Sequence, residues 1–329
     1  MSNPGISVLM LSFNHEKYIR ESLDSVLCQK TDIPFEIIIY DDCSTDGSRD
    51  VILDYQSRYP NLVKTIFPDE NQYSKGKSPI AEYLIPSAKG EYVALLECDD
   101  YWTDANKLQR QFEYLSSHSD CAMCAHSVEI FDDGRQSVIG RVNEYDAPRL
   151  FSLSDLVERG GGALQTCSFF CRNSYLQDYI SWRPDKCPVE DWPIMLYMAT
   201  RGNVVCIPEA MGRYRVNNVS SWTGERLENK EHAAIIDRKI IEMLTSLSIL
   251  LPASVFDGIE RKKYTLAYDY AFRKGISPKD AFHELNVSAS SLSNGMRVKL
   301  SIALIAKTVL HKLRLQGLID SALLLVSSK

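Results

Sequence analysis

The first hundred residues alternate between short apolar runs and segments with helical periodicity, and this order constrains the fold more than any other feature. Four runs rich in β-branched and aromatic residues are expected to be buried strands: residues 6–11, 35–40, 62–67 and 91–96. Helices are expected at residues 18–27, at 47–58 with Ser44 or Thr45 as its cap, and within 78–88. This order predicts a mainly parallel sheet with helices on both faces, which binds ligands at the carboxyl ends of its strands.

Three of the predicted strands are followed by polar side chains. Asn14 follows the first strand, the pair Asp41-Asp42 follows the second, and the pair Asp99-Asp100 follows the fourth. Acids in such loops often cap the next helix, and this alternative explains one or two of the loops. It does not easily explain two Asp-Asp pairs at neighbouring strand ends, which favour a shared ligand-binding edge.

The sequence lacks the glycine-rich phosphate loops of two large nucleotide-binding classes. No G-x-G-x-x-G follows the first strand, and no G-x-x-x-x-G-K-[ST] occurs, which disfavours dinucleotide dehydrogenases and P-loop enzymes. A carboxylate-lined edge repels phosphate directly, but Mg²⁺ or Mn²⁺ bridges carboxylates to a diphosphate because both ions prefer oxygen ligands. We therefore expect a metal-dependent α/β domain that handles a nucleoside diphosphate.

Three segments, in this order and spacing, resemble the family-2 glycosyltransferases of the GT-A fold: Ser12-Phe13-Asn14, residues 41–47 and residues 97–102. The resemblance extends from about residue 6 to about residue 222. It implies a Rossmann-like α/β fold with a mainly parallel central sheet, followed here by a C-terminal helical extension. It also implies transfer of a sugar, with inversion, from a nucleotide-sugar donor, expected to be UDP-linked. The acceptor implied is a glycan or lipid-linked glycan in bacterial surface polysaccharide, lipopolysaccharide or glycoprotein synthesis.

The resemblance assigns the nucleoside to the carboxyl ends of the first two strands. The residues expected there are Ser12, Phe13, Asn14, Tyr18, Asp42 and Ser44. Asp42 matches the family residue that hydrogen-bonds the uracil ring.

Asp99 and Asp100 match the family's D-x-D region, which supplies ligands to the ribose and to Mg²⁺ or Mn²⁺. Glu97 stands where the commoner pattern has Asp, and its extra methylene leaves the metal geometry at this position open. Lys75 and Lys77 lie where the family often approaches the diphosphate, with a solvated lysine pair as the alternative.

The pair Glu190-Asp191, placed before an apolar helix, matches the family's catalytic acid pair. Asp191 is the expected base, because inverting transfer requires removal of the acceptor hydroxyl proton. The alternative is that Asp191 only caps the helix, and the two roles are compatible.

Further acceptor-side assignments each have a structural alternative. Trp192 is expected to stack on a sugar or to be buried in the core. Arg215 is expected to neutralise the leaving diphosphate or to form a surface salt bridge. Asn217 replaces a family His, so no third metal ligand is assigned. A strand over 166–171, followed by Arg172, is expected to line the acceptor pocket.

The net charge of −6 is unevenly distributed. Residues 293–329 contain six basic residues and one acid, a net charge of +5, on an otherwise acidic chain that argues against a nucleic-acid partner. An apolar face over 296–314 predicts either a packed helix or an amphipathic helix in peripheral contact with a membrane.

Nine cysteines inside or near apolar runs, and an N-terminus unlike a signal peptide, favour a reduced cytoplasmic protein. The expected domains are a nucleotide-sugar-binding half (1–115), an acceptor-binding half (116–224) and a helical region (225–329). Two rival functions stay open: a sugar nucleotidyltransferase, and an inactive sugar-binding or scaffold protein of the same fold.

Overall fold

The structure, a computed structural model, describes residues 4–217 and 229–288, and the chain divides into two compact units, Met1–Glu225 and Arg226–Lys329. The strands of the first unit are β1 (Ile6–Ser12), β2 (Phe35–Asp41), β3 (Val63–Ile66), β4 (Tyr92–Glu97), β5 (Tyr101–Trp102), β6 (Cys121–Asp132), β7 (Ser137–Val142), β8 (Arg149–Phe151), β9 (Phe170–Arg172) and β10 (Asn203–Val216). Its α-helices are α1 (Ile19–Leu27), α2 (Ser48–Arg58), α3 (Ile85–Ser87), α4 (Lys107–Ser117), α5 (Leu153–Arg159), α6 (Asn173–Trp182) and α7 (Asp191–Arg201). Shorter helical turns are η1 (Tyr73–Lys75), η2 (Ile80–Leu84), η3 (Gly160–Ala163) and η4 (Thr166–Ser168).

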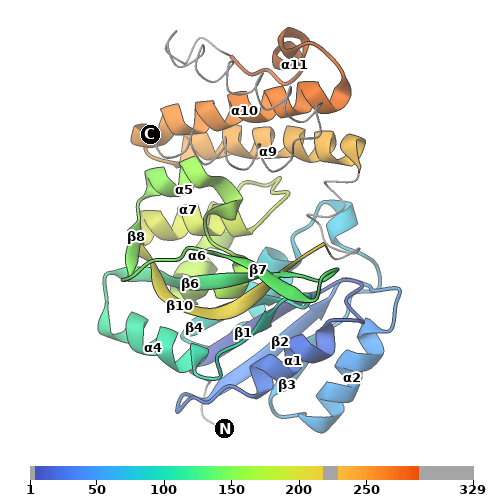
Figure 1. Cartoon of the computed structure of the whole chain (residues 1–329), viewed down its shortest axis with the longest axis vertical. Helices are drawn as coiled ribbons and strands as arrows, with labels where there is room; N and C mark the ends of the chain where they lie inside the picture. The colour runs from blue at the N-terminus through green and yellow to red at the C-terminus, as the bar shows by residue number, and fades with distance from the viewer. Residues whose placement is uncertain (1–3, 218–228, 289–329) are drawn as a thin grey trace. The chain divides into compact units, whose positions relative to one another are not determined.

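One ten-stranded sheet runs through the first unit in the order β3-β2-β1-β4-β9-β6-β10-β5, with β7 beside β6 and β8 beside β10 (Figure 1). The pairs β3–β2, β2–β1 and β1–β4 are parallel, which confirms the parallel sheet predicted for the first hundred residues. β9 is antiparallel to both β4 and β6, so it joins the amino-terminal strands to the later ones. The two halves predicted from the sequence therefore share one sheet.

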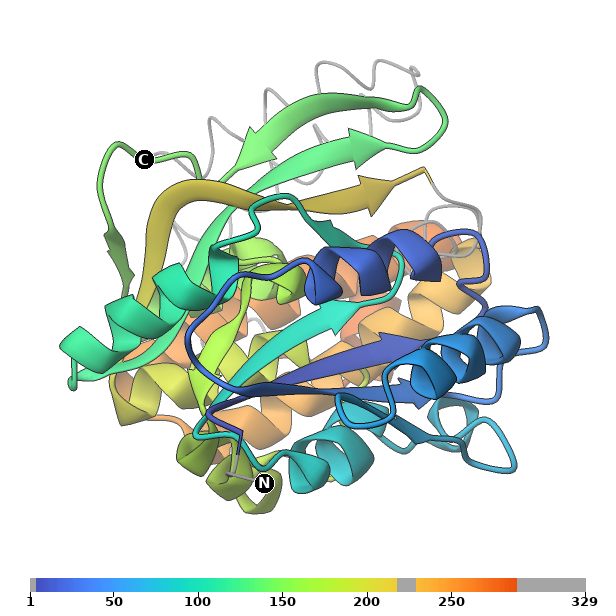
Figure 2. The ribbon, with the colours of Figure 1, turned by 90° about the horizontal axis from the view of Figure 1, so that it is seen from below.

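Helices cover both faces of this sheet, as expected. Figures 1 and 2 show α1, α2 and α4 on one face and α5, α6 and α7 on the other. α1 packs through Ile19, Leu23 and Val26, which recur at helical spacing and are fully buried. α7 is apolar along most of its length and is buried from Trp192 to Met198, which fits its position against β6 and β10.

Two local predictions are wrong. α2 begins after Gly47, and neither Ser44 nor Thr45 caps it, since Asp46 Oδ1 accepts from the Ser48 N–H at 3.0 Å. The strand expected over 166–171 is a 3₁₀ turn followed by the three-residue β9.

The acceptor-pocket role expected for Arg172 is also wrong. Its guanidinium donates to the backbone carbonyls of Cys121 at 2.8 Å, Leu115 at 2.7 Å and His118 at 3.1 Å. These carbonyls lie at the end of α4 and the start of β6. Arg172 therefore holds the scaffold together there and does not line a pocket.

The second unit contains the turn η5 (Ala253–Val255) and the helices α9 (Lys230–Leu250), α10 (Phe256–Lys274) and α11 (Pro278–Glu284). They share an apolar core that includes Ile241, Ala267 and Tyr270. The Ser277 hydroxyl caps α11 by accepting from the Asp280 N–H. No helix within 229–288, or in the described part of the first unit, is long and apolar enough to cross a membrane. The basic segment 293–329 and its predicted helix lie outside the described residues.

Candidate active site

The loops after β1 and β2 are joined by hydrogen bonds at the carboxyl edge of the sheet. Asn14 has a left-handed backbone, with φ 56°, which asparagine adopts more readily than most residues. Asn14 Oδ1 accepts from the Thr45 N–H at 2.8 Å, and the Asn14 N–H donates to Ser44 Oγ at 2.8 Å. Ser44 also donates to Asp41 Oδ1 at 2.5 Å. Asn14 and Ser44, both expected at the nucleoside, thus lie in one hydrogen-bonded loop pair.

Three further residues of this group, Ser12, Phe13 and Tyr18, have different environments. Phe13 is 41% exposed at the end of β1, so its ring is open to a planar ligand. Ser12 is buried, and its hydroxyl has no hydrogen-bond partner in the part of the chain that the structure describes. Tyr18 is buried, and its hydroxyl donates to Asp133 Oδ2 at 2.9 Å. Phe13 is therefore the aromatic surface that this edge presents.

Asp42, which is expected to recognise the base of the nucleotide, is buried. It holds the segment around the start of η1 in place through hydrogen bonds. Its Oδ1 accepts from the Gln72 N–H at 2.8 Å and from the Tyr40 hydroxyl at 3.1 Å, and its Oδ2 accepts from the Tyr73 N–H at 3.0 Å. A carboxylate has about four acceptor positions, so these three hydrogen bonds leave room for one further donor.

The two lysines of the following loop are exposed and differ in their partners. Lys75 forms an ion pair with Glu70, which supports the solvated alternative for this residue. Lys77 is exposed beside it. Both the diphosphate and the solvated alternatives therefore stay open for Lys77.

Three carboxyl groups crowd the end of β4. Burial, the charge of Asp99 and the charge of Asp191 together raise the pKa of Glu97 to about 8. Burial and the charges of Asp99 and Glu97 also raise the pKa of Asp100 well above its usual range. Like charges held together in a buried place oppose one another's ionisation. The carboxyl groups at the end of β4 therefore oppose one another's ionisation, and a cation bound there would favour their ionised forms.

Asp100 has one oxygen available to a cation. Its Oδ1 accepts from the Arg215 N–H at 2.8 Å, whereas its buried Oδ2 accepts from no nitrogen or hydroxyl in the described residues, and only the weakly donating Cys167 thiol lies beside this carboxyl. An oxygen donor of this kind suits Mg²⁺ or Mn²⁺, with Asp99 as a neighbouring ligand. Within residues 4–217 and 229–288, no three His, Cys, Asp or Glu side chains already surround one point. The residues thus fit a metal that the protein and the donor diphosphate hold together.

Asp191 is the first residue of α7, and Glu190 precedes the helix as its cap position. Burial, with a contribution from the charge of Glu190, raises the pKa of Asp191 to about 6, although the Trp192 N–H stabilises the ionised form. The glycine turn η3 approaches this carboxylate closely, because a Cβ placed on Gly161 would lie 3.1 Å from Asp191 Oδ2. A carboxylate with this pKa is ionised at neutral pH and accepts a proton more readily than an ordinary aspartate. The hydrogen bond from the Trp192 N–H also orients this carboxylate, so a capping role at the start of α7 is compatible with acceptance of a proton.

The two neighbours of Asp191 are structural. Glu190 is buried and accepts hydrogen bonds from the Tyr179 hydroxyl and from Arg183 Nη2, the latter at 2.6 Å. Trp192 is buried, and its indole N–H donates to the Leu156 carbonyl at 3.0 Å. The sugar-stacking prediction for Trp192 is therefore wrong, and the core alternative holds. Glu190 and Trp192 thus fix the start of α7 on either side of Asp191.

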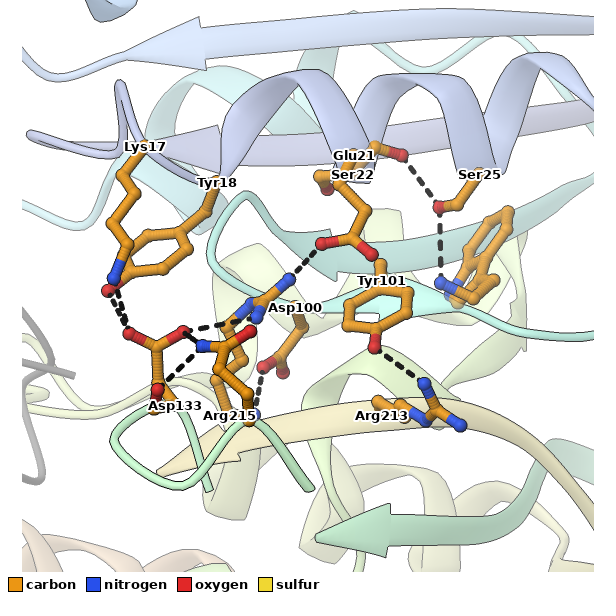
Figure 3. A network of polar contacts seen from close by, with 12 residues as sticks. Lys17, Tyr18, Glu21, Ser22, Ser25, Asp100, Tyr101, Asp133, Arg213 and Arg215 are labelled. Atoms are coloured by element: carbon orange, nitrogen blue, oxygen red, sulfur yellow. Dashed lines mark hydrogen bonds and ion pairs between the residues drawn. The ribbon is translucent and has the colours of Figure 1, made fainter. Parts of the chain in front are cut away.

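Arg215 also pairs with other residues of the protein. Its buried guanidinium forms ion pairs with Glu21 and with Asp133, the latter at 3.4 Å, and lies over the rings of Tyr18 and Tyr101 (Figure 3). The predicted contact of Arg215 with the diphosphate is therefore not available in this arrangement. The alternative of a salt bridge holds, but the bridge is buried rather than on the surface.

The sequence analysis missed three residues that connect these parts. Glu21 and Asp133 hold Arg215, and Tyr73 donates from its hydroxyl to the Pro188 carbonyl at 3.2 Å. Tyr73 thereby links the segment at Asp42 to the loop that leads into α7. A sequence signal existed only for Asp133, which lies in an Asp-Asp-Gly turn signature at the end of β6.

The sequence model of "Glycosyl transferase family 2" matches residues 7–179. The chain belongs to this family. An uncharacterized protein of Mycobacterium tuberculosis is 34% identical over 235 residues, covering 71% of this chain and 62% of its own length, so the chain spans about three fifths of that relative. The Escherichia coli enzyme WfgD, named as a UDP-Glc:α-D-GlcNAc-diphosphoundecaprenol β-1,3-glucosyltransferase, is 26% identical over 270 residues, covering 80% of this chain and 96% of WfgD.

Solved structures show that the fold is the GT-A fold of such transferases. Residues 1–349 of TarS from S. aureus, crystallised with UDP, superpose with a TM-score of 0.54 at 18% identity, covering 95% of this family-2 chain and 91% of that one. The mannosyltransferase PcManGT from Pyrobaculum calidifontis, in complex with GDP-Man and Mn²⁺, superposes with a TM-score of 0.57 at 14% identity, covering 100% and 87%. The α/β prediction with helices at the C-terminus is thereby confirmed.

Proposed function

We propose that this chain is an inverting, metal-dependent glycosyltransferase that moves a sugar from a UDP-linked donor to an acceptor hydroxyl. One observation carries the proposal: the charge of Asp191 helps to raise the pKa of Glu97. A charge that raises the pKa of a second carboxyl lies near it in the fold, so this effect supports a site shared by the start of α7 and the acidic end of β4. A base and a diphosphate-holding edge are the two parts that such a transfer requires.

The donor is held at the carboxyl ends of β1, β2 and β4. Phe13 offers an exposed ring to the nucleoside, and Asp42 retains one acceptor position for a base N–H. Asp99 and Asp100 would hold Mg²⁺ or Mn²⁺, and the bound ion would offset the negative charge of the leaving diphosphate. Lys77 is an exposed cation in the loop beside this edge.

Asp191 acts as the base. The acceptor oxygen attacks the anomeric carbon on the face opposite the diphosphate, forming one carbon–oxygen bond as the bond to the diphosphate oxygen breaks. The hydroxyl proton passes to the Asp191 carboxylate, whose pKa of about 6 keeps it ionised at neutral pH. One displacement of this kind inverts the anomeric carbon.

The acceptor class proposed is a glycan or lipid-linked glycan of the bacterial surface. The name of WfgD specifies a diphosphoundecaprenol-linked acceptor, and WfgD aligns with most of this chain. Such an acceptor requires action at the cytoplasmic face of a membrane, where the basic segment 293–329 would supply peripheral contact. Deletion of 293–329 is expected to weaken sedimentation with anionic liposomes, and unchanged sedimentation would exclude this role.

The central test is a screen of UDP-sugars and GDP-mannose with Mn²⁺, first for hydrolysis and then with lipid-linked acceptors. In Asp191→Asn, donor binding should persist while transfer falls by about 10²- to 10⁴-fold, the usual contribution of a general base. Asp185→Asn is the matched control, because this acid is exposed in the same loop. Full transfer by Asp191→Asn would refute the base assignment.

The same screen separates the rival functions. A sugar nucleotidyltransferase would form a nucleotide-sugar from a nucleoside triphosphate and a sugar phosphate, and an inactive binding protein would bind a donor without turning it over. Membership in glycosyl transferase family 2 favours the transferase over both.

A further inference from the structure

A buried charge network links the predicted metal ligand Asp100 to residues far from it in sequence. Figure 3 shows Arg215 between Glu21, on α1, and Asp133, in the turn after β6. Arg215 contacts these acids through its side chain and Asp100 through its backbone N–H, which donates to Asp100 Oδ1 at 2.8 Å.

Asp133 is the centre of the network. Its Oδ1 accepts from Arg215 Nη1 at 3.4 Å and from Gln136 Nε2 at 3.0 Å, and its Oδ2 accepts from the Tyr18 hydroxyl at 2.9 Å and from Lys17 Nζ at 2.6 Å. These partners hold the pKa of Asp133 below its usual range despite its burial. Asp133 is thus an ionised, nearly buried carboxylate whose acceptor positions are all used.

The network determines where the Arg215 backbone lies. The side chain of Arg215 is only 5% exposed, so its charge depends on Glu21 and Asp133 for compensation. A buried charge that loses a partner moves or draws in water rather than staying in place. Because Arg215 is the last residue but one of β10, such a movement displaces the N–H that restrains Asp100.

We propose that Asp133, supported by Glu21, is a positioning residue for the divalent cation site. By fixing Arg215 it keeps Asp100 Oδ1 in a hydrogen bond and leaves Oδ2 directed toward the cation. The inference rests on the proposed function, since it concerns the same metal. Partners in the outer shell of a metal site commonly control affinity in this way.

A second ion pair between β10 and β6 provides a matched control. Arg213, two residues before Arg215, donates to Glu129 Oε2 at 2.9 Å and to the Tyr101 hydroxyl at 2.8 Å. Glu129 also accepts from Arg141 at 2.9 Å, and within the described residues the two arginines are the hydrogen-bond partners of its side chain. Glu129→Gln therefore weakens an arginine–carboxylate pair of the same strand without releasing the Arg215 backbone.

The test measures Mn²⁺ binding to the full chain in the presence of UDP, from the electron paramagnetic resonance signal of free Mn²⁺. Asp133→Asn should raise the Mn²⁺ dissociation constant about tenfold, the lower end of the range for outer-shell partners. UDP binding without metal should change less than about threefold, a split that general loss of structure would not produce. Glu129→Gln should bind Mn²⁺ like the wild type.

Glu21→Gln covers the case in which Asp133→Asn does not fold, because the Glu21 side chain is 54% exposed and its loss leaves no buried cavity. It should weaken Mn²⁺ binding in the same direction by a smaller factor. Wild-type Mn²⁺ affinity in the folded Asp133→Asn or Glu21→Gln variants overturns the positioning role while the metal site stands. Failure of the wild type itself to bind Mn²⁺ with UDP overturns the metal assignment of the proposed function, and this inference with it.

Discussion

The backbone N–H of Arg215 donates to Asp100 Oδ1 at 2.8 Å and joins residues 115 positions apart in the sequence. This contact connects the last strand of the sheet to the acidic end of β4. It occupies one oxygen of Asp100 and leaves the other without a nitrogen or hydroxyl donor among the described residues. The predictions below test the groups that surround this arrangement.

Transfer should depend on the ionisation of Asp191. The base acts only when deprotonated, so kcat/KM should rise with pH and level off above about 6, the value to which burial raises its pKa. The charge of Glu190 opposes this ionisation, and the hydrogen bond from the Trp192 N–H favours it. Initial rates from pH 4.5 to pH 8 would measure this rise in kcat/KM. A kcat/KM that does not change across pH 6 would contradict the assignment of Asp191 as the base.

The same pKa predicts that Asp191 reduces stability. A carboxyl whose pKa is higher in the folded state than its usual value of 3.8 destabilises the fold as pH rises from about 4 through 6. Asp191→Asn should therefore be more stable than the wild type at pH 8, by at most about 3 kcal/mol at 1.36 kcal/mol per pKa unit. Urea unfolding at pH 8 and at pH 4 would test this, since the gain should vanish at pH 4.

Two adjacent glycines near Asp191 should respond differently to substitution. A Cβ on Gly161 would lie 3.1 Å from Asp191 Oδ2, whereas a Cβ on Gly162 would meet nothing within 4 Å. Gly161→Ala should displace the carboxylate and lower kcat about tenfold, because small errors in the position of a base are costly. Gly162→Ala is the control and should stay within about twofold; equal effects of the two would contradict the contact.

Tyr73 should couple the donor-binding segment to the base. Its hydroxyl donates to the Pro188 carbonyl at 3.2 Å, three residues before Asp191. Tyr73→Phe removes this hydrogen bond while keeping the backbone contact with Asp42, so kcat should fall about two- to tenfold with little change in the donor KM. Tyr83→Phe is a suitable control, because the Tyr83 hydroxyl contacts only the Gln72 side chain of the same segment.

Lys107 should make stability depend on pH in the alkaline range. It is fully buried, donates to Gln111 Oε1 at 2.7 Å and lies 4.0 Å from the Trp102 ring centre, and burial lowers its pKa to about 7. The unfolded chain binds this proton more tightly, so stability should rise with pH between 7 and 10.

Lys107→Met removes this dependence. The stability of the variant relative to the wild type should fall as pH rises from 7 to 9.5, by at most about 1.4 kcal/mol per pH unit. Urea unfolding at both pH values gives the comparison. A difference that is the same at pH 7 and pH 9.5 would show that Lys107 is not the responsible group.

The parallel strands and the polar residues at their ends could be predicted from the sequence. β1, β2 and β4 are short apolar runs whose signal is local, and each is followed directly by the side chains that meet at the edge. The cap of α2 was mispredicted because Ser44 bonds to Asp41 and Asn14 instead of the helix. Competition between a local cap and a partner from a distant loop cannot be read from spacing.

The contacts of two residues predicted to bind ligand, Trp192 and Arg215, depend on tertiary packing. Trp192 and Arg215 were each assigned a ligand contact by position, yet the first packs in the core and the second pairs with Glu21 and Asp133. Burial of a tryptophan or a charge depends on which elements surround it. That information lies in the tertiary structure, because neither partner of Arg215 is near it in the chain.

The sequence by itself determined the α/β class, the order of the strands and the acidic edge, since hydrophobic periodicity and strand-end residues are local properties. Only the tertiary structure decided which carboxylates act on one another. Glu97 and Asp191 are far apart in the first unit's sequence, yet the charge of Asp191 helps to raise the pKa of Glu97, because the fold brings the two carboxyl groups near each other. Electrostatic interaction depends on distance and surroundings in space, and a chain acquires both only when it folds.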